Sequence, residues 1–212
     1  MIMIVLFGPP GVGKGTQAEF ISQSFGLSII STGALLRKLD SKSIVLNNIS
    51  NGRLVPDDIV SSLLKEQIIS NSNMNGYILD GYPRTISQVQ FLDKLSENQN
   101  IYRIYYIHLY LEEKKIVNRL TSRFLCLGCK KVYNNLTIMP KIQGVCDTCG
   151  GQNFFIRDDD NINSINVRLS IYRQETQKIV DTYRGRKTYK KILADNSITT
   201  IRDTIFQFLQ SN

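Results

Sequence analysis

The 212-residue sequence predicts an α/β protein with a five-stranded parallel sheet and helices on both faces. Short apolar runs of strand length alternate with longer segments that have helical spacing. The apolar runs are continuous, as expected of strands that are covered on both sides. The first run also breaks directly into a glycine-rich turn that opens a helix, which is typical of a strand-helix-strand fold.

The expected elements follow one another along the whole chain. Strands are expected at 2–7, 27–30, 76–80, 104–111 and 190–195. Helices are expected at 14–25, 57–70, 86–97, 112–122, 162–184 and 199–210. Together these elements predict one main domain, formed by residues 1–31, 57–122 and 159–212, because alternating strands and helices build a single layered core.

Two regions interrupt this alternation. Residues 32–56 contain short helical pieces without a strand, and residues 123–158 are rich in turns and hold all four cysteines. Both are predicted to be insertions beside the sheet.

The composition argues against a nucleic-acid partner and against export. The net charge is +8, but the 26 Lys and Arg residues are spread along the chain, which suits small anionic ligands as well as it suits nucleic acid. The apolar run before Gly8 is short for a signal peptide, and no stretch approaches the ~18 apolar residues of a membrane span. We therefore expect a soluble, cytoplasmic protein with no membrane partner. We also expect a monomer, although none of these features indicates the oligomeric state.

The stretch GPPGVGKG, residues 8–15, has the spacing of a phosphate-binding loop. Glycines allow consecutive backbone N–H groups to turn towards phosphates, and the helix N-terminus adds positive potential. Lys14 would supply a charge for the β and γ phosphate oxygens. A turn without a ligand would explain the glycines, but it would not explain Gly-Lys-Gly-Thr at a helix start.

The stretch DGYPRTISQ, residues 80–88, follows the third strand. Ligands gather at the carboxyl ends of strands in an open parallel sheet. There, Asp80 could hold a metal-bound water and Arg84 could clamp a phosphate, while Gln88 offers a donor and an acceptor to a base edge. A plain turn is the alternative for this stretch taken by itself.

Arginines recur where a phosphate could lie. In STGALLR, Thr32 could simply cap a helix, but Arg37 lies about one turn beyond Gly33 and could reach a phosphate near that N-terminus. Phosphoryl transfer needs positioned cations more than an acid or a base. Further candidates are the arginines at 119, 123, 157 and 168, although any one of them could sit in a surface ion pair.

The cysteines form two CxxC pairs, Cys126 with Cys129 and Cys146 with Cys149, separated by sixteen residues that leave room for a small hairpin. This spacing predicts a tetrahedral zinc site. Four thiolates leave no open position for substrate, so the zinc would be structural. Disulfides are the alternative, disfavoured in a reducing compartment, and neither pair opens a sheet helix as a redox CxxC would.

His108 is the single histidine and lies within an apolar run, so a buried, hydrogen-bonded core role is expected. Four nearby tyrosines are also expected to pack rather than to recognise a ligand: Tyr102, Tyr105, Tyr106 and Tyr110.

One detail of the phosphate-binding loop narrows the family. The position after Lys14 is Gly15 instead of Ser or Thr, and the hydroxyl is one place further on, at Thr16. That variant is characteristic of nucleoside monophosphate kinases. With the motifs above, spread from residue 4 to about residue 202, the sequence resembles the adenylate kinase family, in its long, zinc-containing form.

The resemblance implies a role for each candidate residue. Residues 32–56 become an AMP-binding insertion, with AMP contacts from Thr32, Arg37, Arg53, Leu54, Val55, Gly81, Tyr82, Pro83, Arg84, Gln88, Arg157 and Arg168. Residues 123–158 become a zinc-binding lid. ATP contacts are implied for Gly11, Val12, Gly13, Lys14, Gly15, Thr16, Arg119, Arg123, Val132, Tyr133 and Asn196. The implied catalytic residues are Lys14, Arg123, Arg157, Arg168 and Asp159. Asp159 and Asp160 match a pair of carboxylates in the lid of the family.

The implied reaction is the Mg²⁺-dependent transfer of the γ-phosphoryl of ATP to AMP, giving ADP, with Asp80 holding Mg²⁺ through water. The sequence departs from the family pattern at Ala34, in the short stretch between Arg37 and Leu54, and in NINSINVR at 161–168, which lacks an acidic pair and a basic residue.

Three other functions remain open. A kinase of UMP or CMP, or one using GTP, would share most of these motifs. A nucleic-acid-binding ATPase with a zinc ribbon belongs to a different class, and nothing else in the sequence resembles a helicase or motor. A GTPase switch lacks its NKxD guanine motif here.

Overall fold

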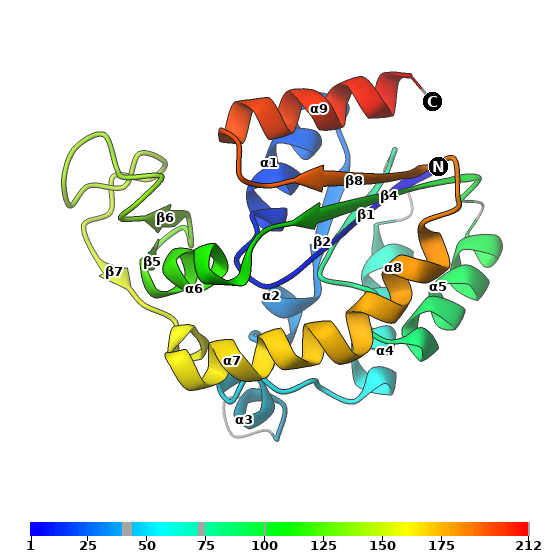
Figure 1. Ribbon diagram of the computed structural model, residues 1–212, viewed down its shortest axis with the longest axis horizontal. Coiled ribbons are helices and arrows are strands. Elements are labelled where there is room, and N and C mark those ends of the chain that lie inside the picture. The colour runs from blue at the N-terminus through cyan, green and yellow to red at the C-terminus, as the bar shows by residue number, and fades with distance from the viewer. Residues whose placement is uncertain (40–43, 72–74, 100, 212) are drawn as a thin grey trace.

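The computed structural model describes residues 1–39, 44–71, 75–99 and 101–211. Its main sheet has five parallel strands, as the sequence predicts, in the order β2-β3-β1-β4-β8 (Figure 1). Their bounds are β1 Ile2–Phe7, β2 Ser28–Ser31, β3 Gly76–Asp80, β4 Arg103–Tyr110 and β8 Tyr189–Leu193. Strand β1 lies at the centre, so the loop that follows it opens where the strand order changes direction.

Helices cover both faces of this sheet (Figure 1). Alternate residues of β1 enter different cores: Met3, Val5 and Phe7 face one, and Ile4 and Leu6 face the other. The first core is closed by α4 Asp57–Ser70, α5 Ile86–Asn98 and α8 Gln177–Tyr183. The second is closed by α1 Lys14–Phe25, α6 Glu113–Thr121, α7 Ile162–Ile171 and α9 Ile198–Gln210. Burial on both sides explains the continuous apolar strands.

The predicted helix at 162–184 is not uniform. Between α7 and α8 the chain makes a π-helical turn, Tyr172–Thr176. The Tyr172 hydroxyl lies 2.9 Å from Nε2 of His108, and the Tyr189 hydroxyl lies 3.1 Å from Nδ1. His108 is 2% exposed and stacks on Phe7, so the prediction of a hydrogen-bonded core histidine is confirmed.

One tyrosine prediction is wrong. Tyr105 and Tyr106 are buried, but Tyr102 is 79% exposed because it precedes the first residue of β4 and lies outside the packed part of the sheet.

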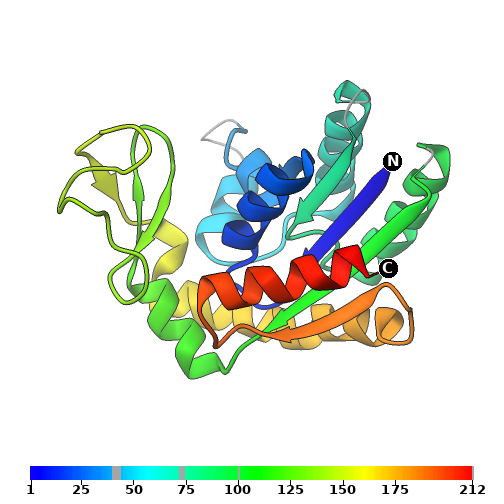
Figure 2. The same ribbon diagram turned by 90° about the horizontal axis from the view of Figure 1, so that it is seen from above.

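The two interrupting regions carry short elements of their own. Residues 32–56 contain α2 Thr32–Leu36 and α3 Ile44–Ser50, while residues 40–43 lie outside the described part of the chain. Residues 123–158 carry a separate antiparallel sheet in the order β6-β5-β7, formed by β5 Arg123–Cys126, β6 Val132–Asn134 and β7 Phe154–Phe155. Figure 2 shows this lid standing to one side of the main sheet. A short 3₁₀ turn, Asp158–Asp160, leads back to α7.

Within the described ranges, no helix is both long enough and apolar enough to cross a membrane.

Candidate functional site

The glycine-rich loop links β1 to α1. Gly8, Gly11 and Gly13 have φ of 143°, 73° and 107°, which side-chain-bearing residues rarely adopt. A Cβ on Gly8 would also lie 2.1 Å from the carbonyl oxygen of Leu109. The loop therefore passes so close to β4 that only glycine fits at its start.

Lys14 is the first residue of α1, and its ammonium donates to the carbonyl oxygens of Gly8 and Pro9, both at 2.9 Å. Part of the side chain reaches solvent, but the ammonium lies within a dense shell of protein atoms. This desolvation lowers the pKa of Lys14 to about 7; Asp80 opposes the shift, and the positive charges of nearby arginines add to it. These arginines are Arg84, Arg168 and Arg123.

Asp80 ends β3 beside this loop. Its Oδ2 accepts from Ser31 Oγ at 3.3 Å, and a Cβ built on Gly15 would lie 3.5 Å from the same oxygen. A carboxylate in this position, next to the first turn of α1, has the hard oxygen ligands that Mg²⁺ and its bound waters prefer.

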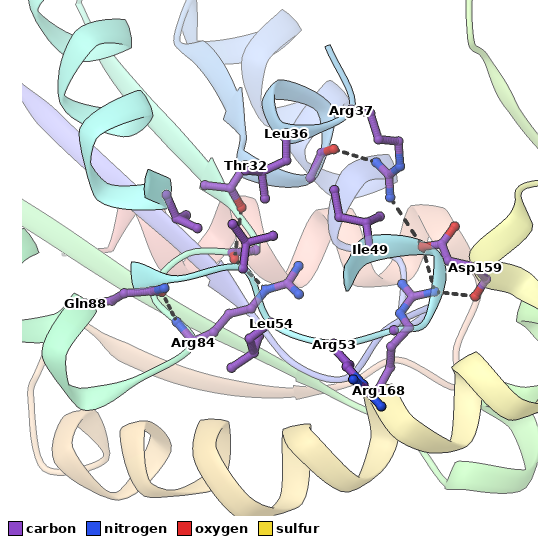
Figure 3. A pocket seen from close by; sticks show the side chains of 15 residues that line it. Thr32, Leu36, Arg37, Ile49, Arg53, Leu54, Arg84, Gln88, Asp159 and Arg168 are labelled. Atoms are coloured by element: carbon purple, nitrogen blue, oxygen red, sulfur yellow. Dashed lines mark hydrogen bonds and ion pairs between the residues drawn. The ribbon is translucent and has the colours of Figure 1, made fainter. Parts of the chain in front are cut away.

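A pocket opens between the insertion, the end of β3 and the start of α5 (Figure 3). Nine of the residues predicted for AMP line it: Thr32, Arg37, Arg53, Leu54, Val55, Gly81, Arg84, Gln88 and Arg168. In Figure 3, Gln88 lies at one end of the pocket, and Asp159 with Arg37 and Arg168 lies at the other. The arrangement suits a ligand with a polar base at one end and a phosphate at the other.

Short polar contacts shape the floor of this pocket. Thr32 Oγ1 and Arg84 Nε both donate to the carbonyl oxygen of Gly81, at 3.1 and 2.8 Å. Gly81 has φ of 83°, and a Cβ there would lie 2.9 Å from the Arg84 guanidinium. Tyr82 is fully buried, its hydroxyl lies 2.9 Å from Ser61 Oγ, and it is not among the residues that line the pocket.

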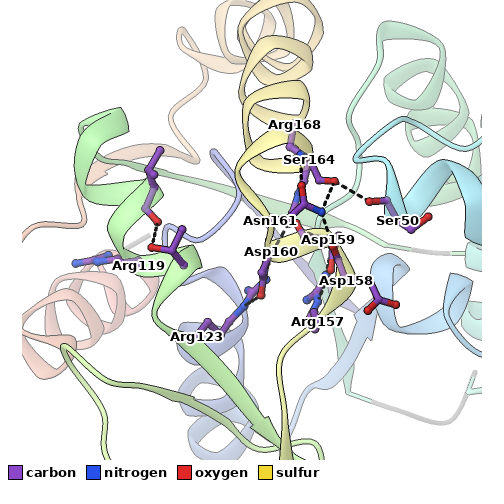
Figure 4. A network of polar contacts seen from close by, with 12 residues as sticks. Ser50, Arg119, Arg123, Arg157, Asp158, Asp159, Asp160, Asn161, Ser164 and Arg168 are labelled. Atoms are coloured by element: carbon purple, nitrogen blue, oxygen red, sulfur yellow. Dashed lines mark hydrogen bonds and ion pairs between the residues drawn. The ribbon is translucent and has the colours of Figure 1, made fainter.

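The second end of the pocket is a cluster of arginines around two carboxylates (Figure 4). Asp159 pairs with Arg157, Arg168 and Arg37, while Asp160 pairs with Arg123 and Arg168. Both carboxylates are buried. Four guanidinium groups face two negative charges, so the cluster keeps an excess of positive charge for an anionic ligand.

The pKa of Asp159 reflects this excess of positive charge. Burial alone would raise its pKa, but the hydrogen bond and charge of Arg157, together with Arg168 and Arg123, outweigh burial and lower it. Burial also lowers the pKa of Arg168 to about 10, partly offset by Asp159. Asp159 therefore stays ionised and helps Arg168 to remain charged.

The unusual stretch NINSINVR has a structural role at the start of α7. Asn161 caps the helix by accepting from the Ser164 backbone N–H at 2.9 Å. Ser164 Oγ donates to the carbonyl oxygen of Ser50 at 2.7 Å, and Gly52 packs so closely that a Cβ would lie 2.5 Å from Ser164 O. The insertion thus contacts the helix that follows the lid.

The residues predicted for ATP include one group beside the glycine-rich loop and another group in the lid. Arg119 donates to the carbonyl oxygens of Val12 at 3.4 Å and Ala194 at 2.8 Å, and so joins the loop to the turn that carries Asn196. Val132 is on the lid surface, but the Tyr133 side chain is buried inside the lid. The Tyr133 ring thus packs in the interior of the lid, and the contact of Val132 and Tyr133 with ATP stays a prediction.

The four cysteines converge in the lid, as predicted. Their sulfur atoms all lie within 4.8 Å of one another, and the pairs Cys126 with Cys149 and Cys129 with Cys146 are each 3.5 Å apart. All four thiols are free. Zn–S bonds of about 2.3 Å in a tetrahedron place sulfurs somewhat under 4 Å apart, so the cluster fits a zinc ion.

The two CxxC turns have matching backbones. The Lys130 N–H donates to Cys126 O at 3.0 Å, and the Gly150 N–H donates to Cys146 O at 2.9 Å. Lys130 and Gly150 also share a positive φ, 62° and 72°. Tyr133 donates its hydroxyl to Cys146 Sγ at 3.4 Å, a contact that orients this ligand.

Sequence reasoning missed several residues of the pocket. Leu36, Ile49 and Val60 line it, yet apolar residues of short helices are indistinguishable from core residues in a sequence. Asp57 was also missed, although it bonds Gln88; helix-opening acids are common, so its type alone carries little information.

The comparisons with known proteins agree with this geometry. The Adenylate kinase family profile matches residues 6–188. The chain is 34% identical to the adenylate kinase of Rickettsia africae over 99% of its own length and 100% of the relative's. It is 37% identical to that of Chloroherpeton thalassium and 35% identical to that of Thermodesulfovibrio yellowstonii, each over 98% of both chains. With its phosphate-binding loop, arginine cluster and four-cysteine lid, this chain belongs to the adenylate kinase family.

Proposed function

We propose that this enzyme transfers the γ-phosphoryl of ATP reversibly to AMP, giving two molecules of ADP, with Mg²⁺ as cofactor. The observation that carries this proposal is that the charges of Arg84, Arg123 and Arg168 all act on Lys14, beside a pocket that ends in Gln88. Lys14 would bind the donor phosphates, and Arg84 and Arg168 would bind the acceptor phosphate.

The donor would bind on the glycine-rich loop. Backbone N–H groups of the loop and the Lys14 ammonium would hold its β and γ phosphates, and Arg119 with the Asn196 turn would border its base. Mg²⁺, when bound with ATP, supplies positive charge to the phosphates, and Asp80 would hold its waters.

The acceptor would lie in the pocket of Figure 3, with its base at Gln88 and its phosphate near Arg37, Arg84 and Arg168. Arg123 and Arg157, which now pair with Asp160 and Asp159, would turn to the transferring phosphoryl as nucleotides bring competing negative charge. Residues 123–158 would close over the site and exclude water, which would otherwise accept the phosphoryl.

Zinc held by the four cysteines would have a structural role. The lid has a core of only a few buried side chains, centred on Cys126, Tyr133 and Cys146. Such a small unit gains folding free energy from its metal.

A coupled assay over a panel of nucleoside triphosphates and monophosphates tests this function. ATP with AMP should give the highest kcat/KM. A preference for UMP, CMP or GTP would point to a related kinase, and phosphate release that requires nucleic acid would point to an ATPase of another class.

A further inference from the structure

We propose that Asp57 is a positioning residue that fixes the amide of Gln88 in one orientation and so selects an aminated base over its oxo counterpart. The inference rests on the proposed function, because it concerns the base of the acceptor nucleotide. It assigns a specificity role to a side chain that is absent from the lining of the pocket.

Asp57 joins the starts of two helices. It is the first residue of α4, and its Oδ1 accepts from Gln88 Nε2 at 2.6 Å. Its Oδ2 accepts from Thr85 Oγ1 at 2.6 Å and from Ser87 Oγ. Thr85 in turn caps α5 by accepting from the Gln88 backbone N–H. All three of these hydrogen bonds to the carboxylate come from the first turn of α5 and the residue that caps it.

The opposite side of the Gln88 amide is held by the main chain. Gln88 Oε1 accepts from the Arg84 backbone N–H at 2.7 Å. A backbone N–H can only donate and an ionised carboxylate can only accept, so the chemistry of the two partners fixes which end of the amide faces each. Turning the amide over would set its NH₂ against an N–H and its oxygen against a carboxylate. Gln88 is also 2% exposed, so water cannot easily compensate for that loss.

The fixed amide has one donor and one acceptor left for the pocket. Adenine presents an acceptor at N1 and a donor at its 6-amino group, which complement Nε2–H and Oε1. Hypoxanthine, which has a 6-oxo group, presents a donor at N1 and an acceptor at O6, so both contacts would be repulsive. Uracil has the same reversed pattern, whereas cytosine shares the pattern of adenine. The amide thus rejects IMP and UMP, and other parts of the pocket must reject CMP.

The test compares kcat/KM for AMP and for IMP, which differ only at this edge of the base. Asp57→Ala should lower the AMP-to-IMP ratio by about tenfold, the equivalent of one hydrogen bond to a charged group, while the KM for ATP stays unchanged. A purely structural role would lower kcat/KM for AMP and for IMP by the same factor and would leave their ratio unchanged. Asp58→Ala is the matched control, because Asp58 is the next residue of the same helix turn and is exposed.

A double-mutant cycle shows whether Asp57 acts through Gln88. Gln88→Ala should lower the ratio by itself, and adding Asp57→Ala should lower it no further. If Asp57→Ala fails to fold, Asp57→Asn serves, since it keeps an oxygen for Gln88 but can also offer an N–H. Its ratio should fall to an intermediate value.

The outcomes separate the two proposals. An unchanged ratio in both Asp57 variants, with a lowered ratio in Gln88→Ala, would overturn the role of Asp57 and leave the enzyme an AMP kinase. Additive losses in the double variant would also overturn it. A wild-type enzyme that does not prefer AMP would instead overturn the proposed function.

Discussion

The guanidinium of Arg157 forms a two-pronged ion pair with the carboxylate of Asp159, with Nε and Oδ1 2.7 Å apart. The same carboxylate lies 3.2 Å from Arg168 and 3.4 Å from Arg37. Asp159 is therefore the counter-charge that holds three arginines together before a nucleotide supplies its own negative charge.

Asp159→Asn should lower the free energy of unfolding by about 3 to 5 kcal/mol at pH 7, as expected when a buried ion pair loses one partner. The pKa of Asp159 is lowered in the folded protein, so its contribution is present above the unfolded carboxyl pKa and is lost as pH falls below it. Urea denaturation at several pH values measures both effects.

Asp158→Asn is the control for this variant. Asp158 is the neighbouring residue and is exposed, and among the described residues its carboxylate forms no ion pair within 4 Å. It should unfold as the wild type does. If the free energy of unfolding fell equally in the two variants, Asp159 would not be the residue that stabilises the arginine cluster. Saturating nucleotide should restore part of the stability of Asp159→Asn, because phosphates replace the lost charge.

Lys14→Ala should reduce kcat by at least about a hundredfold, because the lost charge would act on phosphate oxygens as negative charge develops. Thermal unfolding should change little, since within the described part of the chain the ammonium donates only to the loop's own carbonyl oxygens. Lys65→Ala, on the exposed face of α4, is the control. An undiminished kcat in Lys14→Ala would rule out a catalytic role for the loop.

Binding of ATP should take up protons from solution at about pH 8. The pKa of Lys14 is about 7 in the free protein, so at that pH most Lys14 side chains are neutral. Phosphate oxygens favour the charged form and should raise this pKa. Calorimetric titration in two buffers with different ionisation enthalpies gives the number of protons bound. Lys14→Met should abolish the uptake, and proton release by the wild type would contradict the assignment.

Much of the fold could be predicted because its strands are buried on both faces. The run Ile2–Phe7 has no polar position to confuse with a helix face, and the structure places that strand as expected. The π turn at Tyr172–Thr176 could not be predicted, since YRQET is an ordinary helical sequence. It depends on tertiary contacts such as the one from Tyr172 to His108, which lies 64 residues away.

The site was predictable where a motif has its own chemistry. Gly8 and Lys14 define a loop, and four cysteines at CxxC spacing define a metal cluster. The link from Asp57 to Gln88 was not predictable, because it depends on how α4 and α5 meet across 31 positions of sequence. The contact from the Tyr133 hydroxyl to Cys146 was not predictable either, because it depends on how the lid folds around its cysteines.

His108 should make the protein less stable below about pH 6.5. Burial, with the nearby charges of Lys191, Arg184 and Lys14, lowers its pKa to about 4. Between these pH values the unfolded state binds more protons, so stability rises with pH by up to about 3 kcal/mol in total. His108→Gln keeps polar atoms for Tyr172 and Tyr189 but does not titrate. Its unfolding free energy should fall less than that of the wild type between pH 7 and pH 5; parallel curves would contradict this account.

Zinc removal should loosen the lid before the rest of the protein. The purified enzyme should contain about one zinc per chain, as expected of a tetrahedral four-thiolate site. Cys146→Ser should lower the melting temperature, because metal binding contributes folding free energy to a region with so small a core. Hydrogen exchange should increase first in residues 123–158, while the five-stranded sheet keeps its protection.

Turnover measured after zinc removal distinguishes a structural metal from a catalytic one. None of the four cysteines lines the pocket that holds Gln88 and Arg168, so part of the turnover should survive at low temperature without zinc. A chelator should destabilise the wild type but should have little further effect on Cys146→Ser, which already lacks one ligand. Loss of all turnover while the lid remains protected from exchange would show that the metal acts in catalysis. Iron in place of zinc, or a disulfide between the CxxC pairs, would show that the cluster serves electron transfer or redox chemistry instead.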